Sequence, residues 1–253
     1  MNDAAAVAAR LSTIAAPPLV ATLAIVAALA VVASGFGARF GVWDYRAAFA
    51  ILRWGAYAGL GIALFALLLL AIPATRPRGL VALSLAVAVG SVAGVVPLAW
   101  MQGARGIPPI NDITTDPANP PMFVALLPLR AGATVPATYA GPATADMQRS
   151  AYPDIAPIIV ADAPNAAFAT AMAVARGMGW TIIAADALVG RIEAVATTPW
   201  FGFRDDIVVR VSPQGRGSRV DVRSVSRVGR GDLGANAKRV REFSAAMAAR
   251  STR

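Results

Sequence analysis

The sequence contains no cysteine and no histidine. Thiolate nucleophiles, disulfides, thiolate or imidazole metal ligands and histidine general bases are therefore missing from its chemistry. These absences exclude most familiar hydrolase and zinc-dependent mechanisms. They carry no information about the compartment, because a cysteine-free domain suits reducing and oxidising surroundings equally well.

Charge is also scarce: only 15% of the 253 residues are charged, and Lys238 is the one lysine. The first hundred residues contain three uncharged stretches, between Arg10 and Arg39, between Arg53 and Arg76, and between Arg78 and Arg105. A hydrocarbon core about 30 Å thick requires about 20 apolar residues in a helix. We therefore predict a three-helix transmembrane region over residues 1–104. Its expected spans are Leu19 to Phe36, entered through Pro17 and Pro18 in a first helical turn, Trp54 to Ile72, and Leu80 to Trp100.

The orientation of these spans does not follow from their flanking charges. Cytoplasmic loops carry an excess of Lys and Arg. Three spans would place Arg10, Arg76 and Arg78 on one side of the membrane and Arg39, Arg46, Arg53 and Arg105 on the other. The two sides are too similar for the rule to decide. No charge lies inside a span, which argues against a proton relay or an ion pathway.

The rest of the chain divides into two parts. Residues 105–154 are rich in Pro, Gly, Ala and Thr, which predicts an extended linker without a helix. Residues 155–253 predict a soluble α+β domain in the order strand, helix, four strands, helix. The last helix is expected from Leu233 to Arg250, capped by Asp232. Adjacent hairpins with a helix at each end indicate an antiparallel sheet packed on two helices, a helix-grip-like fold.

Two sequence motifs in this part of the chain are specific enough to compare with known families. They are Thr-Thr-Pro-Trp-Phe-Gly-Phe-Arg-Asp-Asp from Thr197 and Gly-Ser-Arg-Val-Asp-Val-Arg-Ser-Val-Ser-Arg-Val-Gly from Gly217. Together with Asn-Asp-Ile-Thr-Thr-Asp from Asn111, they resemble the family called domain of unknown function 1499, in its membrane-anchored branch. That family has no established activity. Some of its members resemble exported lipoproteins, which implies a domain outside the cytoplasm.

Asp205 and Asp206 are the first candidate site. Adjacent carboxylates could bind a divalent metal ion or act as an acid and base pair. However, neighbouring residues of a strand point to opposite faces, so only one of them could serve a given site. The alternative is structural, with one carboxylate at the entry of the hairpin and the other paired with arginine.

The second candidate site is basic. If Val209 lies opposite Val222, then Arg210 lies opposite Asp221 as a cross-strand ion pair. Further along, Arg223 and Arg227 lead to the N-terminus of the last helix, where free backbone N–H groups could bind a phosphate or carboxylate. A structural ion-pair network would explain the same residues. The complete candidate binding set is Asp205, Asp206, Arg223, Arg227, Asp232, Asn236 and Arg239.

Three classes of function fit this sequence. The first is a non-catalytic membrane-tethered binding or scaffolding module of the bacterial cell envelope. The second is a small-molecule or lipid-binding domain with a cavity between sheet and helix, and the third is an Asp-dependent metal enzyme. We expect no cofactor, and an enzyme is the less favoured reading because Ser224 and Ser226 have no general base nearby.

The expected partners follow from charge and apolarity, whereas the expected location also depends on the exported members that the family resemblance implies. The spans predict contact with the lipid bilayer, and the basic excess from Arg204 onward, within a net charge of +9, indicates anionic lipid headgroups or another envelope protein as further partners. We expect no nucleic acid, because no aromatic platforms alternate with the basic residues. The expected location is the bacterial inner membrane, with several spans and a periplasmic soluble domain.

Overall fold

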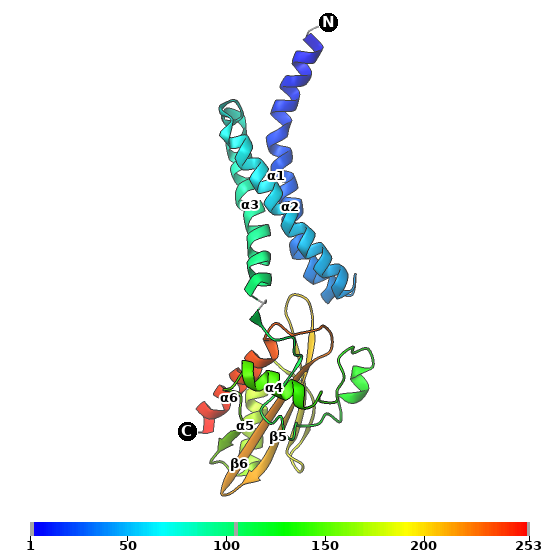
Figure 1. Cartoon of the computed structure of the whole chain (residues 1–253), viewed down its shortest axis with the longest axis vertical. Coiled ribbons are helices and arrows are strands. Elements are labelled where there is room, and N and C mark those ends of the chain that lie inside the picture. The colour runs from blue at the N-terminus through cyan, green and yellow to red at the C-terminus, as the bar shows by residue number, and fades with distance from the viewer. Residues whose placement is uncertain (1–2, 104–105, 252–253) are drawn as a thin grey trace. The chain divides into compact units, whose positions relative to one another are not determined.

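The computed structural model describes residues 3–103 and 106–251, with the side chains of residues 3–15 left out (Figure 1). The described residues form two compact units. The helical unit comprises residues 3–103 and the short turn Pro199–Gly202. The sheet unit comprises Gly106–Thr198 and residues 203–251.

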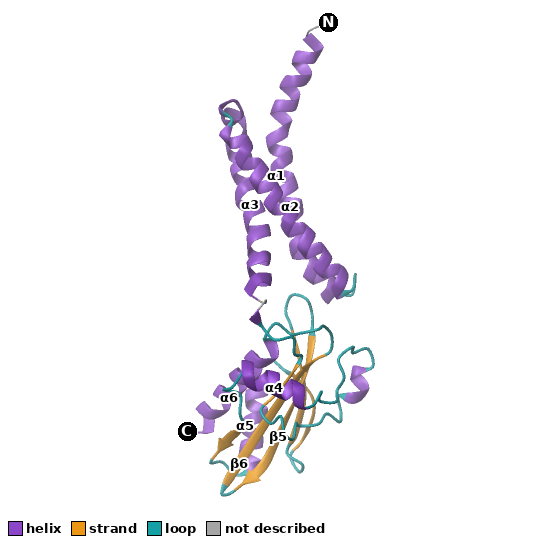
Figure 2. Cartoon of the chain, viewed as in Figure 1, coloured by secondary structure: helices purple, strands orange, loops and turns teal. Residues whose placement is uncertain are grey.

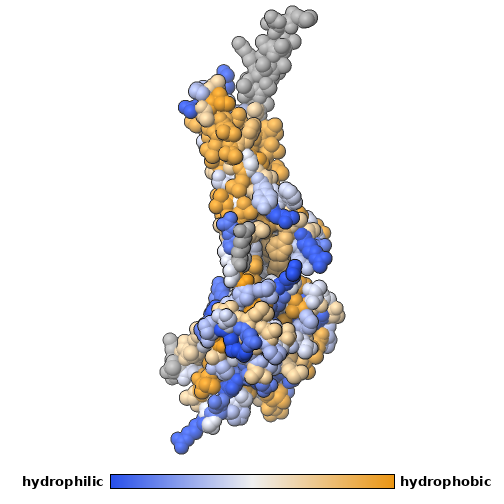
Figure 3. All heavy atoms as spheres, in the orientation of Figure 1, coloured by the Kyte–Doolittle hydropathy of each residue, from blue (hydrophilic) through white to orange (hydrophobic). Residues whose placement is uncertain are grey.

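The helical unit consists of three long helices. They are α1 (Asp3–Arg39), α2 (Tyr45–Ala71) and α3 (Arg76–Gly103), and the short 3-10 helix η1 (Pro73–Thr75) joins the last two. Each is long and apolar enough to cross a membrane, which confirms the three predicted spans and indicates a membrane protein. On the face that Figure 3 shows, the coloured residues of these helices are mostly hydrophobic.

The start of the first helix was predicted wrongly. Pro17 and Pro18 lie inside α1, which already begins at Asp3, and not in its first turn. The start of α2 follows the usual rules: the Asp44 carboxylate caps it by accepting the backbone N–H groups of Arg46 (2.7 Å) and Ala47 (2.9 Å).

Glycines allow α2 and α3 to approach closely. A methyl group on Gly90 would lie 2.5 Å from the carbonyl oxygen of Gly59, and one on Gly59 would lie 2.9 Å from that of Gly90. Gly61, also in α2, has open space around the position of a side chain. The small residues therefore act at particular crossings, as in other membrane helix pairs.

The turn Pro199–Gly202 packs within the helical unit. The Trp200 indole N–H donates to the carbonyl of Val32 in α1 (2.9 Å), and the Phe201 ring stacks on that of Phe49 in α2, with 5.1 Å between centroids. Aromatic side chains beside a strand usually enter the core of their own domain. These two residues pack on apolar helices instead.

The sheet unit is built on one antiparallel sheet. Its strands are β1 (Asp112–Thr114), β2 (Ile158–Val160), β3 (Thr181–Asp186), β4 (Arg191–Thr197), β5 (Arg204–Gln214) and β6 (Gly217–Ser226). The order is β1-β6-β5-β4-β3, and β2 pairs with the other end of β6. Val209 lies opposite Val222 and Arg210 opposite Asp221, so the predicted register of the central hairpin is correct.

Helices α5 (Pro164–Gly177) and α6 (Ala235–Ser251) pack on one face of this sheet. The main hydrophobic core lies between these layers and includes Trp180 and Phe243, whose rings stack with centroids 5.3 Å apart. This arrangement confirms the α+β fold with an antiparallel sheet on two helices (Figure 2). Helix α6 begins two residues later than predicted, because Leu233 has a left-handed backbone conformation (φ 55°) that no helix interior allows.

The segment that we expected to be a linker, residues 105–154, differs in the structure. From Gly106 it belongs to the sheet unit. It contains β1, the 3-10 helix η3 (Leu127–Arg130) and helix α4 (Pro142–Ala151), and it is mostly loop (Figure 2). Buried polar contacts, such as those of Gln148 with Thr114 and of Arg223 with Pro121, hold it on the domain.

This segment covers the second face of the sheet. Phe123 and Leu126 pack there against Val195, Val208 and Val225 in a second hydrophobic cluster. At the sheet edge, the Gln148 side chain of α4 accepts the backbone N–H of Thr114 (3.0 Å) and donates to its carbonyl (2.7 Å). The amide of one glutamine thereby replaces a neighbouring strand beside β1.

Candidate functional site

The two adjacent aspartates of β5 point to opposite faces of the sheet. Asp205 contacts α6 through Arg239, whereas Asp206 contacts the covering segment through Arg130. Both carboxylates are buried. They cannot bind one metal ion together, and no group of three or more acidic side chains suited to a metal occurs among the residues that the structure describes.

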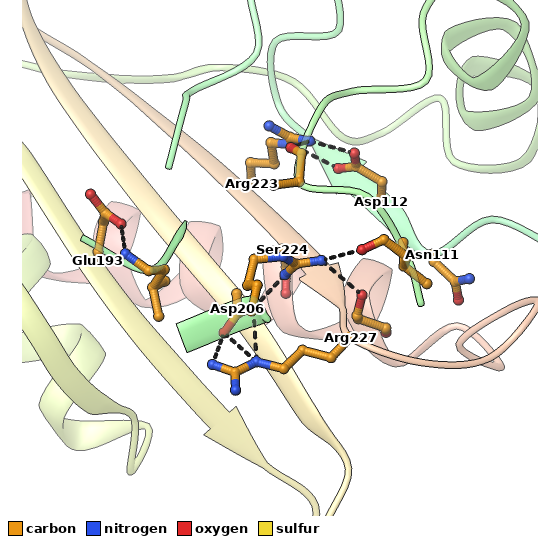
Figure 4. Close-up of polar contacts among 12 residues, drawn as sticks. Asn111, Asp112, Glu193, Asp206, Arg223, Ser224 and Arg227 are labelled. Carbon is orange, nitrogen blue, oxygen red and sulfur yellow. Dashed lines mark hydrogen bonds and ion pairs between the residues drawn. The ribbon is translucent and has the colours of Figure 1, made fainter. Parts of the chain in front are cut away.

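Asp206 is the centre of an ion-pair cluster. The Arg227 guanidinium donates to both of its oxygens, with Nη2 2.7 Å from Oδ1 and Nε 3.0 Å from Oδ2 (Figure 4). Arg130 binds Oδ2 from the opposite side and also donates to the carbonyl of Val135 (2.8 Å). Arg227 is therefore engaged within the protein.

Asp205 belongs to a separate polar cluster beneath α6. Its Oδ2 accepts from Nη2 of Arg239 at 2.6 Å. Nη1 of the same guanidinium donates to the Asn236 amide oxygen (2.6 Å) and to the Ser224 hydroxyl (2.9 Å). The Asn236 amide nitrogen in turn donates to the Ser226 hydroxyl (2.9 Å). Both serines lie in this network without a histidine or lysine to activate them.

Arg223 forms a third cluster with Asp112 of β1. Its Nε and Nη2 donate to the two carboxylate oxygens at 2.9 and 2.6 Å, which is bidentate geometry (Figure 4). The rings of Phe123 and Tyr139 lie beside the guanidinium, with centroids 5.2 and 5.5 Å from Cζ. Burial raises the pKa of Asp112, and Arg223 opposes that rise. Burial together with the charge of Asp112 raises the pKa of Tyr139 to about 12.

The N-terminus of α6 is occupied by the protein's own carboxylate. Asp232 accepts the backbone N–H groups of Gly234 (2.9 Å) and Asn236 (2.7 Å). Burial is the main cause that raises the pKa of Asp232, and nearby Asp205 adds to it. Asp232 therefore supplies the anion that we had expected from a ligand, and Arg223 and Arg227 point to other carboxylates.

A fourth acidic group was missed by sequence reasoning. Glu193 of β4 is fully buried and accepts the backbone N–H groups of Val124, Ala125 and Leu126 at 2.9 to 3.1 Å. It also pairs with Arg191. Alternation along β4 sets Glu193 on the face opposite Ile192 and Ala194, and the sequence contains no sign that another layer covers that face.

Two further partners were missed because they lie in the supposed linker. Asp112 holds Arg223, and Arg130 holds Asp206. Arg130 is the only charged residue between Asp116 and Asp146, which is a signal that could have identified it. The predicted pair of Arg210 and Asp221 is present at 2.8 Å, and Asp116 joins it by accepting from Arg210 at 3.0 Å.

Comparison with known protein families identifies the family of this chain. A family model described as protein of unknown function (DUF1499) matches residues 112–247. The chain belongs to this family. The matched region begins at Asp112, so it includes most of the covering segment and the buried groups around Asp205, Asp206, Arg223 and Glu193. A search of curated proteins gave no match.

Proposed function

We propose that this DUF1499 protein is a non-catalytic, membrane-tethered binding or scaffolding module of the bacterial cell envelope. One observation carries the proposal: each buried charged residue of the candidate set has a partner from within the sheet unit. Those pairs are Asp205 with Arg239, Asp206 with Arg227, and Arg223 with Asp112. Side chains bound in this way stabilise the fold, and these carboxylates are engaged within the sheet unit instead of being available as a general acid or base.

The location belongs to the same proposal. Three apolar helices support attachment to a membrane. We assign the protein to the inner membrane with the sheet unit in the periplasm, on the basis of the exported members of the family. Its partners are the bilayer itself, including anionic headgroups, or another envelope protein.

The two alternative functions have less support. A lipid-binding cavity would lie between the sheet and its helices, where Trp180, Phe243 and Met247 pack in one hydrophobic cluster. A metal enzyme would need carboxylates that converge, whereas Asp205 and Asp206 diverge. Both observations favour a module that acts through its surface.

Affinity purification from native membranes tests the proposal. We expect the full chain to capture a defined envelope component that a fragment limited to residues 1–105 does not capture. The Asp205→Asn variant separates binding from catalysis. A folded Asp205→Asn protein that still captures the component but fails to replace the wild-type protein in cells would support an enzyme and contradict this proposal.

A further inference from the structure

An apolar surface on the covering segment is left open to solvent. Thirteen residues without a charge separate Asp116 from Arg130. Within them Met122 is 76% exposed, Val124 51%, and Leu127 and Leu129 50% each. We call the stretch from Pro121 to Arg130 the apolar loop. Exposed apolar side chains that gather in this way indicate an interaction site.

The apolar loop is held from below by its buried residues. Phe123 and Leu126 alternate with the exposed side chains and enter the cluster on the sheet. The Glu193 carboxylate binds three consecutive N–H groups, those of Val124, Ala125 and Leu126. One buried charge thereby fixes the backbone from which the exposed side chains project.

Both ends of the loop are tied down by arginines. Nη1 of Arg223 donates to the carbonyl of Pro121 at 3.1 Å, at the start of the loop. At its end, Arg130 is paired with the buried Asp206. Arg223 and Asp206 of the DUF1499 motifs therefore share one role, because each holds one end of the loop.

We call the contacts of Glu193, Arg223 and Arg130 with the apolar loop the frame. Burying these charged groups costs free energy. Burying charges is unfavourable unless each is paired, and long segments without regular structure occur in compact domains mainly where they serve a function. An entirely apolar interior would cover this face of the sheet with fewer demands on geometry. The frame is therefore better explained by what the loop presents on its outer side than by stability alone.

The surface that the apolar loop contacts can be inferred from the chain itself. The sheet unit begins at Gly106, three residues after the spanning helix α3 ends at Gly103. Three residues of chain reach at most about 11 Å. This short connection keeps the sheet unit near the bilayer in which α3 is inserted. The bilayer is therefore present at a high effective concentration for the apolar loop. The exposed side chains of the loop are aliphatic or methionine and carry no charge, which suits the boundary of the hydrocarbon region.

We propose that the apolar loop inserts its exposed side chains into the surface of the lipid bilayer. This inference deepens the proposed function, on which it rests, by naming the surface that contacts lipid.

The absence of cysteine allows a direct test, because a single introduced thiol is labelled uniquely. The full chain carrying Leu127→Cys or Leu129→Cys is labelled with an environment-sensitive fluorophore. It is then reconstituted in vesicles of phosphatidylcholine and phosphatidylglycerol. We expect a blue shift of emission and a loss of emission when lipids with a spin label on the acyl chain are included. Arg216→Cys, at the exposed turn between β5 and β6, provides the solvent reference.

Two results would overturn the proposal. Labels at Leu127→Cys and Leu129→Cys that iodide quenches as strongly as the Arg216→Cys label, without quenching by the spin-labelled lipids, would show a loop in water. Crosslinking between two Leu127→Cys chains, again without quenching by lipid, would assign the loop to a second copy. Purified protein is sufficient for this test, so its failure leaves the capture experiment for the proposed function unaffected.

Discussion

At Arg227, the guanidinium binds both oxygens of Asp206, a carboxylate with no exposure to solvent. Arg241 binds both oxygens of Asp154 in the same manner, but at the surface of the protein. The two arginines therefore make similar contacts in different surroundings. Their comparison separates the effect of burial from that of the ion pair itself.

We expect Arg227→Gln to lower the free energy of unfolding by about 2 to 3 kcal/mol, because it removes charged hydrogen bonds from a buried acid. The matched variant Arg241→Gln should cost less than about 1 kcal/mol, since exposed pairs contribute little. Thermal unfolding of the full chain in detergent, followed by near-ultraviolet circular dichroism, measures both. An anion site at Arg227 would give the opposite pattern, with weaker binding to anionic vesicles and an unchanged melting temperature.

Asp232 adds a dependence on pH. Burial and Asp205 raise its pKa in the folded protein above the ordinary value of 3.8. A carboxyl of this kind binds its proton more tightly when folded, so its contribution to stability is full below pH 3.8 and declines as pH rises through the folded-state pKa.

The stability of the wild-type protein relative to Asp232→Asn should therefore decrease as the pH is raised from acid toward neutrality. Melting temperatures of both proteins across that range provide the measurement, and taking their difference cancels the titration of other groups. A difference that increases with pH would mean that the hydrogen bonds from Gly234 and Asn236 dominate over burial.

Among the elements, α2 and α3 depend on a close contact between backbones. Gly59 and Gly90 face each other there, and a methyl group on either would meet a carbonyl oxygen. Elsewhere on α2, Gly61 has space for a side chain. The sequence shows several glycines in these helices, but only the packing identifies which of them are needed.

Substituting Gly90 and Gly61 by alanine should change the melting temperature differently. Gly90→Ala must separate the helices and is expected to lower the melting temperature of the protein in detergent. Gly61→Ala should be neutral or raise it, because alanine favours a helix by up to about 1 kcal/mol relative to glycine. Equal effects of the two substitutions would argue against a close crossing at Gly90.

The elements that could be predicted from sequence are those with local signals. Apolar runs identified α1, α2 and α3, and alternation with turn residues identified the strands from β3 to β6. The register of β5 and β6 also followed from their valines. In contrast, the three residues of β1 carry no periodicity, and its partner β6 lies over a hundred residues away.

In the candidate site, too, local features could be predicted from the sequence and long-range partners could not. Asp205, Asp206, Arg223 and Arg227 were identified as a group by their residue types, but each has its partner on another element. Arg130 and Asp112 lie in a segment rich in proline, which composition assigns to a linker. Spacing along the sequence does not assign a partner to residues on different elements, unless a strand register does so as for Arg210 and Asp221, and the fold supplies the other pairs.

On the scale of the whole molecule, the described residues combine apolar spans with a sheet unit that has both buried ion pairs and exposed charges. The pairs of Arg223 with Asp112 and of Arg227 with Asp206 each join a positive and a negative charge. They therefore leave the basic net charge of +9 unchanged, and exposed arginines such as Arg176 and Arg204 place positive charge at the surface.

The orientation of the protein gives the last prediction. With three spans, the N-terminus and the loop from Pro73 to Gly79 lie on one side of the membrane and the C-terminus on the other. Flanking arginines do not select a side, and the exported members of the family favour a periplasmic C-terminus. Alkaline phosphatase forms its disulfides only in an oxidising compartment, so its fusion after Arg253 should be active in intact cells. The same fusion within the loop from Pro73 to Gly79 should be inactive and serves as the control. Reversed activities would place the sheet unit in the cytoplasm and remove the periplasmic part of the proposed function.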